Sequence, residues 1–371
     1  MPVREYGKEE LQVLKEVLDS GRLSALGGGQ VLPRFEKAFA KAHGAKFGVG
    51  MNSAMSVLHA SMIAAGVGPG DEVICDPVCV FGAQAVLYQR GTPVFVDCQP
   101  VTYNMDPDGI EERITDRTKA IIVTHMGGLP AEMDRIVPIA RRHRLLVVED
   151  CAHAFLARYK GRYAGTWGDL GSFSFQSSKH LSLGDGGMAI TNKVKVRDKL
   201  ALHAGAPTFG AVAHGVHYNF RMNEQTAAIG LVQIPKVRRA CREMVKIGRL
   251  WNRAVTDCPW IVPQEGPEGA QSTYHLWVAT FEGQKYGISR KRFVEALRAR
   301  RLPFSLGYTR RAAYQHPVFR TVFPRNAYPK GLCPNAESMV PRIILAGTMM
   351  PMDAAVRQAE GLREVVEELS R

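Results

Sequence analysis

The sequence predicts an α/β protein in which a large domain is built on a mostly parallel sheet flanked by helices, and a smaller α/β domain follows it. Three observations lead to this fold class. Short apolar runs alternate with helical patterns from residue 35 to about 205, glycine and proline stand at the junctions, and the pattern changes beyond Met222. Strand–helix alternation of this kind predicts parallel pairing through right-handed crossovers.

The first half of the chain supplies the elements of the predicted parallel sheet. Helical spacing that ends at a glycine is found at residues 35–44 and again at 53–66. The short apolar runs that are typical of buried strands lie at residues 71–76, 93–97, 119–125 and 145–150. Helical patterns lie between them, at about 82–90, 107–115 and 132–143.

The second half of the chain predicts a smaller unit. Its expected elements are two helices on either side of a proline, then a strand and two more helices, at residues 223–234, 236–256, 274–281, 289–300 and 353–369. Pro235 is expected to break or kink the first helical pattern. We therefore predict a large domain over residues 1–240 and a small domain over residues 241–371.

Composition places the chain among ordinary globular enzymes. Its 371 residues are enough for two cores, and no run of 18 apolar residues predicts a membrane span. The N-terminus lacks the apolar core of a signal peptide, so we expect a cytoplasmic protein. The net charge of +13 is dispersed, and its densest clusters, at 238–239 and 298–301, fall in helical patterns typical of solvated faces. We expect no nucleic-acid partner, while a positive field favours anionic substrates and a phosphorylated cofactor.

Cysteine and histidine positions form neither a disulfide pattern nor a metal pattern. There is no Cys-x-x-Cys pair, which predicts reduced, buried thiols at residues 75, 79, 98, 151, 241, 258 and 333. His214 and His217 are a close pair in a glycine-rich loop without an acidic partner. We interpret this pair as part of a substrate loop or as solvated surface, and we predict no metal site.

The segment from residue 145 to 192 carries the chemistry. Asp150 closely follows an apolar run, and Lys179 comes 29 residues later in a loop rich in serine and glycine. The short run predicts a buried parallel strand, which places Asp150 at the carboxyl edge of the sheet, where ligands bind in open α/β folds. A pyridoxal phosphate (PLP) enzyme needs such a pair, because the lysine binds the cofactor covalently and the acid keeps the pyridine nitrogen protonated. The alternatives are a surface lysine and an acid that caps the next helix.

Several motifs resemble the DegT/DnrJ/StrS family of sugar and cyclitol aminotransferases. The most specific are EDCAHA, SFSFQSSKHL and GDGG, at residues 149–154, 172–181 and 184–187. The segments that follow the family's order elsewhere are VLPRFEKAFA, GVGPGDEVICDP, TPVFVDC, DRTKAIIVTHMGGLPAEMD, YNFRMNEQTAAIG and STYHLWV. This series covers at least residues 29–300. The resemblance implies the aspartate aminotransferase fold (PLP fold type I) and PLP as the cofactor.

The resemblance implies a role for each matching residue around the cofactor ring. Lys179 would bind PLP and then move a proton between the substrate and cofactor carbons. Asp150 would pair with the pyridine nitrogen, and His153 would lie near the ring and its phenolic oxygen. Phe81 matches the aromatic residue that stacks on the pyridine face. The alternatives for the last two are a structural histidine and a buried core phenylalanine.

A phosphate site is also implied. Ser174 matches a phosphate-binding hydroxyl, and the loop before the second predicted helix would supply backbone N–H groups and the helix dipole. The family has Ser-Gly-Thr in that loop, whereas this chain has Ser53, Ala54 and Met55. The threonine hydroxyl is lost, and alanine adopts a positive φ less readily than glycine. Ser53 or Ser56 would have to compensate, or the cofactor would bind less tightly.

Further segments complete the implied site. Asn219 matches a residue that reaches the phosphate from the neighbouring subunit, which implies a homodimer with a shared active site, and Arg221 is a candidate anion partner. The glycines of 184–187 permit the turn that leads away from Lys179. The glycines of 27–30 resemble a loop at the active-site entrance, and neither set fits a dinucleotide fingerprint.

These expectations lead to an aminotransferase. The family implies glutamate or glutamine as amino donor and a ketone on a sugar or cyclitol as acceptor, in amino-sugar, aminocyclitol or antibiotic biosynthesis. EDCAHA with SFSFQSSKHL resembles the scyllo-inosose aminotransferase-like branch, with nucleotide-linked keto sugars and aminoshikimate-type substrates as alternatives. A PLP- or PMP-dependent sugar dehydratase is disfavoured, because those relatives have histidine where this chain has Lys179. A non-catalytic regulatory relative is a third interpretation, supported by the departure at Met55.

Overall fold

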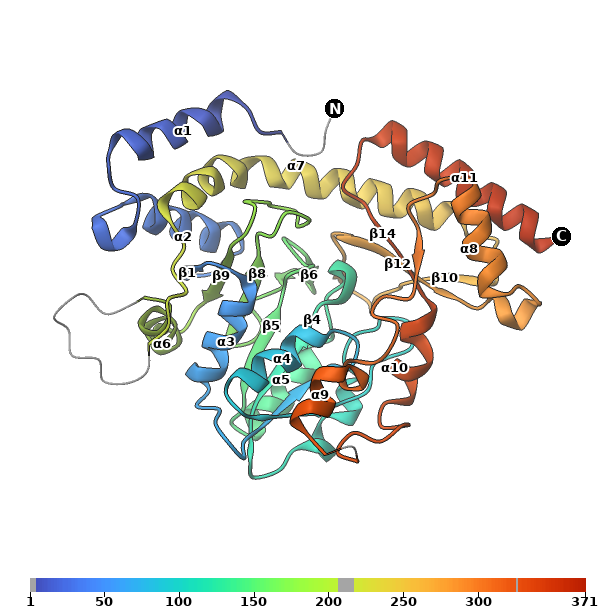
Figure 1. Ribbon diagram of the computed structural model, residues 1–371, viewed down its shortest axis with the longest axis horizontal. Helices are drawn as coiled ribbons and strands as arrows, with labels where there is room; N and C mark the ends of the chain where they lie inside the picture. Colours follow the sequence, from blue (N-terminus) through green and yellow to red (C-terminus); the bar gives the residue numbers. More distant parts are fainter. Residues whose placement is uncertain (1–4, 206–216, 325) are drawn as a thin grey trace.

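The computed structural model describes residues 5–205, 217–324 and 326–371, and its largest sheet has helices on both faces (Figure 1). This sheet has seven strands in the order β1-β9-β8-β5-β4-β2-β3. Only β9 runs antiparallel to its neighbours, so the prediction of a mostly parallel sheet is confirmed. The strands are β1 (Phe47–Met51), β2 (Glu72–Cys75), β3 (Thr92–Phe95), β4 (Thr118–Thr124), β5 (Leu146–Asp150), β8 (Leu170–Ser174) and β9 (Gly187–Thr191).

Side chains alternate between the two faces of this sheet, and each face packs against its own group of helices. Helices α3, α4 and α6 share one hydrophobic cluster with the sheet, and α2, α5 and the start of α7 pack on the opposite face. The bounds are α1 (Lys8–Asp19), α2 (Val31–Ala42), α3 (Ala54–Ala64), α4 (Val80–Tyr88), α5 (Met133–Arg142) and α6 (Val194–Ala204). The prediction of a helix at 107–115 is wrong. Two 3-10 turns, Pro107–Gly109 and Glu111–Arg113, stand there, because Ile110 is the single strongly buried aliphatic residue between them and gives no helical face to pack.

A second, antiparallel sheet has the order β10-β12-β14-β13. Its core is aromatic, with Trp251, Trp260 and Trp277 fully buried against α8, α11 and the end of α7. The bounds are β10 (Ile261–Pro263), β12 (Leu276–Phe281), β13 (Ser305–Leu306), β14 (Ile343–Gly347), α8 (Arg290–Ala299) and α11 (Met352–Ser370). A third sheet is formed by β6 (Arg158–Tyr159), β7 (Arg162–Tyr163) and β11 (Ala270–Gln271).

One helix, α7 (Glu224–Ala254), connects the two larger sheets. It runs through Pro235 without ending, so the expected break into two helices is wrong, and the alternative of a kink stays a prediction. Packing explains the difference: α1 and α2 lie along its first half and α11 along its second, and these contacts offset the missing N–H of proline (Figure 1). The predicted domain boundary at residue 240 falls within this helix and stays a prediction.

The segment between β13 and β14 returns to the large sheet. Ala313 donates its N–H to the Pro77 carbonyl at 2.7 Å, and the Tyr314 ring lies 5.2 Å from that of Phe95. Helices α9 (Pro317–Val322) and α10 (Pro334–Met339) belong to the same hydrophobic cluster as α3 and α4. The largest core therefore contains residues from both halves of the chain.

Two bulk expectations can be compared with the structure. All seven cysteines are buried and unbridged, which confirms the prediction of reduced thiols. In the basic cluster at 298–301, Arg300 pairs with Glu364 and Glu368 of α11 at 3.1 and 2.7 Å, on a solvated helix face. Within the described ranges, no helix combines the length and the apolar character needed to cross a bilayer.

Candidate active site

The carboxyl edge of the large sheet brings an acid and a lysine together. Asp150 is the last residue of β5 and is buried, and Lys179 lies in the turn between β8 and β9. Burial raises the pKa of the Asp150 carboxyl, while the Ala152 N–H at 3.0 Å and the Lys179 cation act to lower it. Burial lowers the pKa of the Lys179 amine, and Asp150 and Cys79 oppose that shift. The two predicted residues therefore interact electrostatically at the expected edge.

Three imidazole rings stack beside Lys179. The ring centroid of His153 lies 4.7 Å from that of His275, with the planes inclined by 25°, and His275 lies 5.3 Å from His180. Burial, with the Lys179 cation and His180 nearby, holds the pKa of His153 well below its usual value, so this ring is neutral at pH 7. Its Nδ1 is buried and has no hydrogen-bond partner in the described part of the chain. That nitrogen can therefore interact with a bound group.

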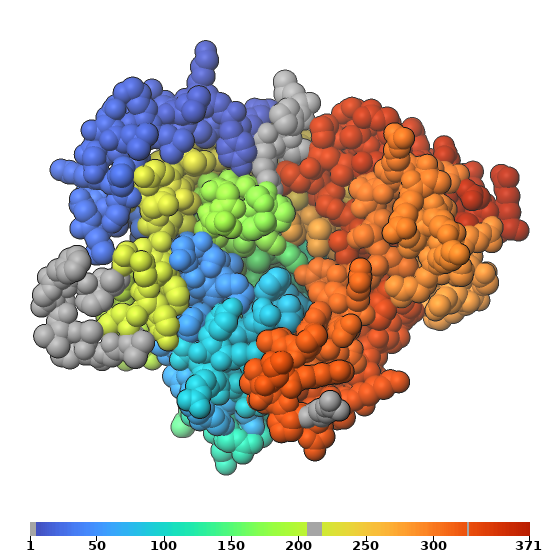
Figure 2. Space-filling view, in the orientation of Figure 1, coloured from blue at the N-terminus to red at the C-terminus, as the bar shows by residue number. Residues whose placement is uncertain are grey.

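Several segments meet around this edge on the face seen in Figure 2, where the blue α3 and α4 adjoin the green turn before β9 and the orange segment after β13. Phe81 is the second residue of α4 and is 48% exposed. The alternative of a buried core phenylalanine is therefore wrong, and one face of the ring is available to a ligand.

Besides His275, two more residues of this edge were not predicted from the sequence. Asp76 directly follows β2, and burial raises the pKa of its carboxyl to about 6, with Thr124 and the Cys79 N–H limiting the rise and Asp150 adding to it. Tyr308 comes from the segment after β13; burial and the nearby Cys79 and Asp150 raise the pKa of its hydroxyl well above the usual value. An acid at a strand end was a signal for Asp76, as it was for Asp150. Tyr308 had no comparable local signal.

The N-terminus of α3, where backbone N–H groups and the helix dipole can attract an anion, is capped by a serine. Ser53 accepts the Ser56 N–H at 3.1 Å, its Oγ lies 3.0 Å from the Ser56 Oγ, and Ser56 donates to Asn52 Oδ1 at 2.5 Å. Ala54 is the first helical residue and does not have a positive φ, so the expected cost of replacing glycine does not arise. Met55 packs its side chain against the α3–α4 core. The departure from the family pattern is thus accommodated by the fold.

Glycines let the turn after Lys179 approach this cap. Gly184 and Gly186 have φ values of +87° and +143°, so the turn predicted for 184–187 is confirmed. A Cβ on Gly187 would overlap the Ser53 backbone, so only glycine lets β9 pass so close to the cap. Ser174 ends β8 beside this turn, and its hydroxyl accepts a backbone N–H at 3.4 Å.

The segment that follows residue 217 lies against the same cap. Asn219 is exposed, and its carbonyl accepts the Asn52 side-chain N–H at 3.4 Å. The Phe220 carbonyl accepts the Asn52 backbone N–H at 2.7 Å. Arg221 forms a bridge to the end of β1, and its Nη1 is buried without a hydrogen-bond partner among the described residues. The structure therefore places Asn219 and Arg221 close to the helix N-terminus.

Comparison with known proteins assigns this arrangement to a family. The DegT/DnrJ/EryC1/StrS aminotransferase family matches the sequence over residues 4–370. The chain belongs to this family. It is 40% identical to GDP-perosamine synthase of Caulobacter vibrioides over 259 residues, and this alignment covers 67% of this chain and 69% of that protein. It is 34% identical over 308 residues to the spore coat polysaccharide biosynthesis protein SpsC of Bacillus subtilis, with 79% and 78% covered.

Solved structures agree with this assignment. DesV of S. venezuelae is 28% identical, has a TM-score of 0.85, and covers 97% of this chain and 94% of its own. 3-Amino-5-hydroxybenzoic acid synthase is 25% identical, with a TM-score of 0.86 and coverage of 98% and 97%. The protein is therefore a PLP-dependent aminotransferase of fold type I, as the sequence predicted, and the dehydratase alternative is not favoured.

The residues at the sheet edge fit PLP. The aminotransferase has a buried acid for the pyridine nitrogen in Asp150 and an amine of lowered pKa in Lys179. The unpartnered Nδ1 of His153 would face the ring, and the α3 cap at Ser53, with Gly187 passing over it, would receive the phosphate. These individual roles stay predictions.

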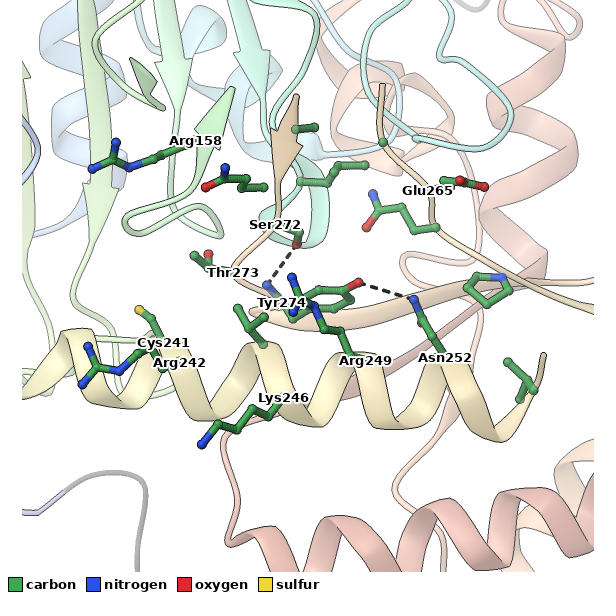
Figure 3. Close-up of a pocket in the computed structure, with 18 of the residues that line it drawn as sticks. Arg158, Cys241, Arg242, Lys246, Arg249, Asn252, Glu265, Ser272, Thr273 and Tyr274 are labelled. Carbon is green, nitrogen blue, oxygen red and sulfur yellow. Dashed lines mark hydrogen bonds between the residues drawn. The ribbon is translucent and has the colours of Figure 1, made fainter. Parts of the chain in front are cut away.

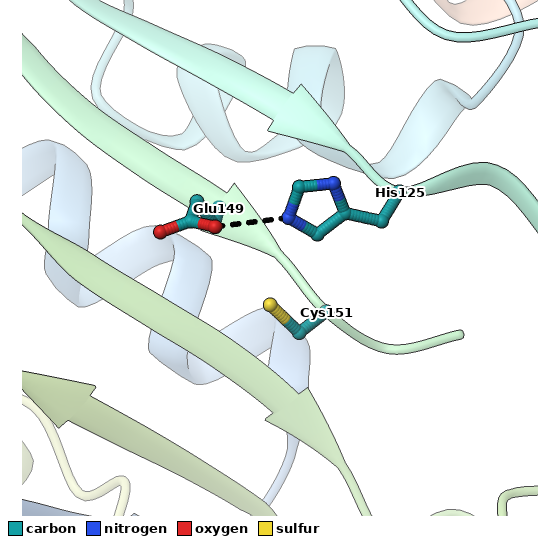
Figure 4. Close-up of side chains that lie close together, drawn as sticks. All are labelled: His125, Glu149 and Cys151. Atoms are coloured by element: carbon teal, nitrogen blue, oxygen red, sulfur yellow. Dashed lines mark hydrogen bonds and ion pairs between the residues drawn. The ribbon is translucent and has the colours of Figure 1, made fainter. Parts of the chain in front are cut away.

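Next to Asp150 the aminotransferase has a second buried acid, Glu149, with His125 and Cys151 beside it (Figure 4). Ala131 donates its N–H to His125 Nδ1 at 3.1 Å, so the proton is on Nε2, which donates to Glu149. Glu149 accepts four hydrogen bonds, from His125 Nε2 at 3.0 Å and from the N–H groups of Gly165, Trp167 and Gly168 at 2.8, 2.7 and 2.7 Å. Although the possible ligand atoms lie within 4.8 Å of one another, those of His125 and Glu149 already have partners, and we assign the cluster to structure rather than to a metal.

Two predicted loops remain. His214 lies outside the described residues, and His217 Nδ1 lies 3.3 Å from a backbone carbonyl. In the glycine loop at 27–30, a Cβ on Gly29 would overlap Glu224, which accepts two N–H groups at the start of α2. This loop therefore has a packing role, and its predicted contact with substrate stays a prediction.

Proposed function

We propose that this aminotransferase moves an amino group from glutamate or glutamine to a keto group on a nucleotide-linked sugar. The juxtaposition of Lys179, Asp150 and His153 at the carboxyl edge carries the proposal. The similarity to GDP-perosamine synthase supports a nucleotide-linked acceptor. A cyclitol ketone of the scyllo-inosose type is the second candidate, favoured by the EDCAHA and SFSFQSSKHL motifs.

When bound, PLP supplies the electron sink that stabilises negative charge on the substrate carbon. Asp150 would keep its negative charge beside the protonated pyridine nitrogen, because a neighbouring cation offsets the effect of burial. Lys179, whose pKa burial lowers, has a larger neutral fraction than an exposed lysine. A neutral amine can accept the proton at the substrate carbon and return it on the other half of the reaction.

The other residues would orient the cofactor and exclude water. Neutral His153 would share a proton with the phenolic oxygen through its Nδ1. Phe81 would cover one ring face with its exposed side. Ser174, Ser53 and the first N–H groups of α3 would bind the phosphate, with Ser56 in place of the threonine hydroxyl.

We also propose a homodimer with a shared active site in the cytoplasm. The support is the position of Asn219, which is exposed at the surface beside the α3 cap. A second copy that packs on this surface would bring its own Asn219 to the phosphate site of its neighbour.

The first test is the absorbance spectrum of the purified enzyme during titration with glutamate and glutamine. We expect the long-wavelength band of lysine-bound cofactor to be lost on addition of the true donor and to be absent in Lys179→Ala. Lys285→Ala removes an exposed lysine and is the matched control. An enzyme that takes up PLP but keeps its band with both donors would contradict the proposed donors. Acceptor assays with a nucleotide-linked keto sugar and with scyllo-inosose would then separate the two candidates.

The shared site has a separate test in mixtures of two inactive variants, Lys179→Ala and Asn219→Ala. If Asn219 serves the partner, half of the randomly mixed dimers contain one intact site, and about a quarter of wild-type activity returns. If Asn219 serves its own subunit, mixing restores nothing. Sedimentation of each variant verifies that both still form dimers.

A further inference from the structure

A cavity of about 1200 Å³ lies away from the predicted cofactor residues, between α7, the β6–β7 hairpin and the segment from β10 to β12 (Figure 3). None of the residues assigned above to PLP lines it. Its size exceeds the usual range for small-ligand pockets, about 300–1,000 Å³, and leaves room for a ligand of several rings.

Cationic side chains converge on this cavity. Arg238, Arg242 and Arg249 come from one face of α7, where residues spaced by about four or seven positions lie together, and Arg158 comes from the hairpin opposite. In the described part of the chain, none of these four forms an ion pair. Lys246 also lines the cavity, but it differs in having a carboxylate partner, Glu243, at 2.8 Å. The arginines therefore carry charge that no protein carboxylate neutralises directly.

Two of the guanidinium groups are held in place by Tyr163. Arg158 lies over its ring at 3.8 Å and donates to the Gly161 carbonyl at 3.0 Å. Arg238 donates to the Ala42 carbonyl at 3.3 Å. Burial alone would raise the pKa of the Tyr163 hydroxyl, but hydrogen bonds from Arg238 and Arg158 lower it. A solvated helix face does not need such positioning, whereas an anion site does.

The rest of the wall is aromatic and apolar. Tyr274 has a φ of +49°, unusual for an aromatic residue, and packs so closely on α7 that a Cβ on Gly248 would overlap its ring. Its hydroxyl accepts the Asn252 side-chain N–H at 3.4 Å. Leu129 and Leu156 add apolar surface on the opposite side. An aromatic base or a sugar face can pack on such a wall.

The acidic side chain of the lining stands apart from the arginines. Glu265 lies at the opposite end of the cavity from Arg158 and Arg242, with Arg249 and Tyr274 between them (Figure 3). A carboxylate accepts hydrogen bonds from the N–H groups of a base but repels phosphate. The cavity is therefore polarised, with a cationic end and an anionic end.

We propose that this cavity is a binding site for a nucleoside diphosphate or triphosphate, separate from the PLP site. The phosphates would contact Arg158 and Arg242, the ribose would lie against Tyr274, and the base would reach Glu265 with its N–H groups. Arginine forks match phosphate oxygens in pairs, and four of the five cationic side chains that line the cavity are arginines. Because Arg158 lies on the hairpin opposite the three arginines of α7, the charges stand on both sides of a hollow, and a small ligand fits better than a nucleic-acid strand.

The test is calorimetric titration of the PLP-loaded enzyme with ADP, GDP and UDP, with guanosine and inorganic pyrophosphate as fragments. We expect at least one nucleotide to bind more tightly than either fragment. The double variant Arg158→Gln/Arg242→Gln should weaken it by about tenfold or more, while the donor half-reaction stays unchanged. The control, Arg292→Gln/Arg298→Gln, removes two exposed charges from α8 and should have little effect.

The measurement can also overturn the proposal. Equal weakening in both double variants would show a general charge effect, and unchanged binding in the first would place the nucleotide elsewhere, as in the acceptor site. Pyrophosphate binding as tightly as the nucleotides, or a single-stranded oligonucleotide displacing them, would reject a nucleotide pocket. Melting temperatures verify folding, and hydrogen exchange along α7 with and without nucleotide locates the site independently.

Discussion

Glu149 and Asp150 are consecutive residues of β5, equally buried, and yet the structure gives them different surroundings. Glu149 accepts four hydrogen bonds from the protein. For Asp150 the described chain supplies one, from Ala152, together with the nearby Lys179. Adjacent strand residues face opposite sides of a sheet, so the two carboxylates meet different neighbours. A buried acid whose oxygens are all used holds the fold, and one with free capacity can hold a cofactor.

The largest expected effect is on activity, in Asp150→Asn. The amide cannot keep the pyridine nitrogen protonated, so we expect kcat to fall by about 10³-fold or more. The unfolding free energy should change by less than about 1 kcal/mol, since one backbone hydrogen bond is at stake. Single-turnover rates with the amino donor and denaturant unfolding give the two values. A large loss of stability with retained activity would show that Asp150 stabilises the fold and does not serve the reaction.

The same chemical change one residue earlier, Glu149→Gln, should affect stability instead. Glutamine offers one acceptor oxygen where the carboxylate has two, and its amide group faces N–H donors. We expect the unfolding free energy to fall by about 2–4 kcal/mol. The cofactor spectrum of the folded fraction should be retained. Glu243→Gln, at a surface ion pair, is the control and should change stability little.

A third carboxylate, that of Glu36, extends the comparison to the pH dependence of stability. Glu36 accepts one N–H, from Gly50 at 2.7 Å, and burial raises its pKa from 4.5 to about 7, with Glu224 adding to the rise. Between these values the folded state keeps a proton that the unfolded state has lost. Wild-type stability relative to Glu36→Gln should therefore decrease as the pH rises from about 4.5 through about 7. Parallel stability curves for the two proteins would contradict this assignment.

The smallest effect is expected for His153→Gln. Burial holds the pKa of His153 well below its usual value, so the imidazole is neutral at pH 7 and its charge plays no part there. We expect kcat to fall by less than about tenfold, because glutamine can also hydrogen-bond the phenolic oxygen. The pH profile between 6 and 8 should keep its shape. A lost ionisation in that range would show that His153 titrates during turnover.

Much of the fold could be predicted because its signals are local. The apolar runs at 71–76, 93–97, 119–125 and 145–150 became β2 to β5, and the strand-end position of Asp150 followed from them. Strands β8 and β9 were not predicted, since LGSFS and GMAIT mix small and polar residues and are strands only because both faces are covered. The break expected at Pro235 does not occur, because packing along α7 overrides the local cost of proline.

The site was predictable where one motif carried it. Lys179, Asp150 and the glycines of 184–187 are in one segment, and the structure places them at one edge. His275 and Tyr308 come from distant segments, and no local pattern shows that they meet His153 or Asp150. The concern about Ala54 depended on a backbone conformation that the sequence does not specify, and its φ proved ordinary.

The return of the segment between β13 and β14 to the large core has a consequence for synthesis. The cluster that contains α3 and α4 also contains Ala313, Phe319, Ala336 and Ile343. During synthesis on the ribosome, part of the apolar surface of the N-terminal half stays exposed until almost the whole chain has emerged. The enzyme should therefore depend on holding chaperones during translation more than a protein whose first domain closes by itself.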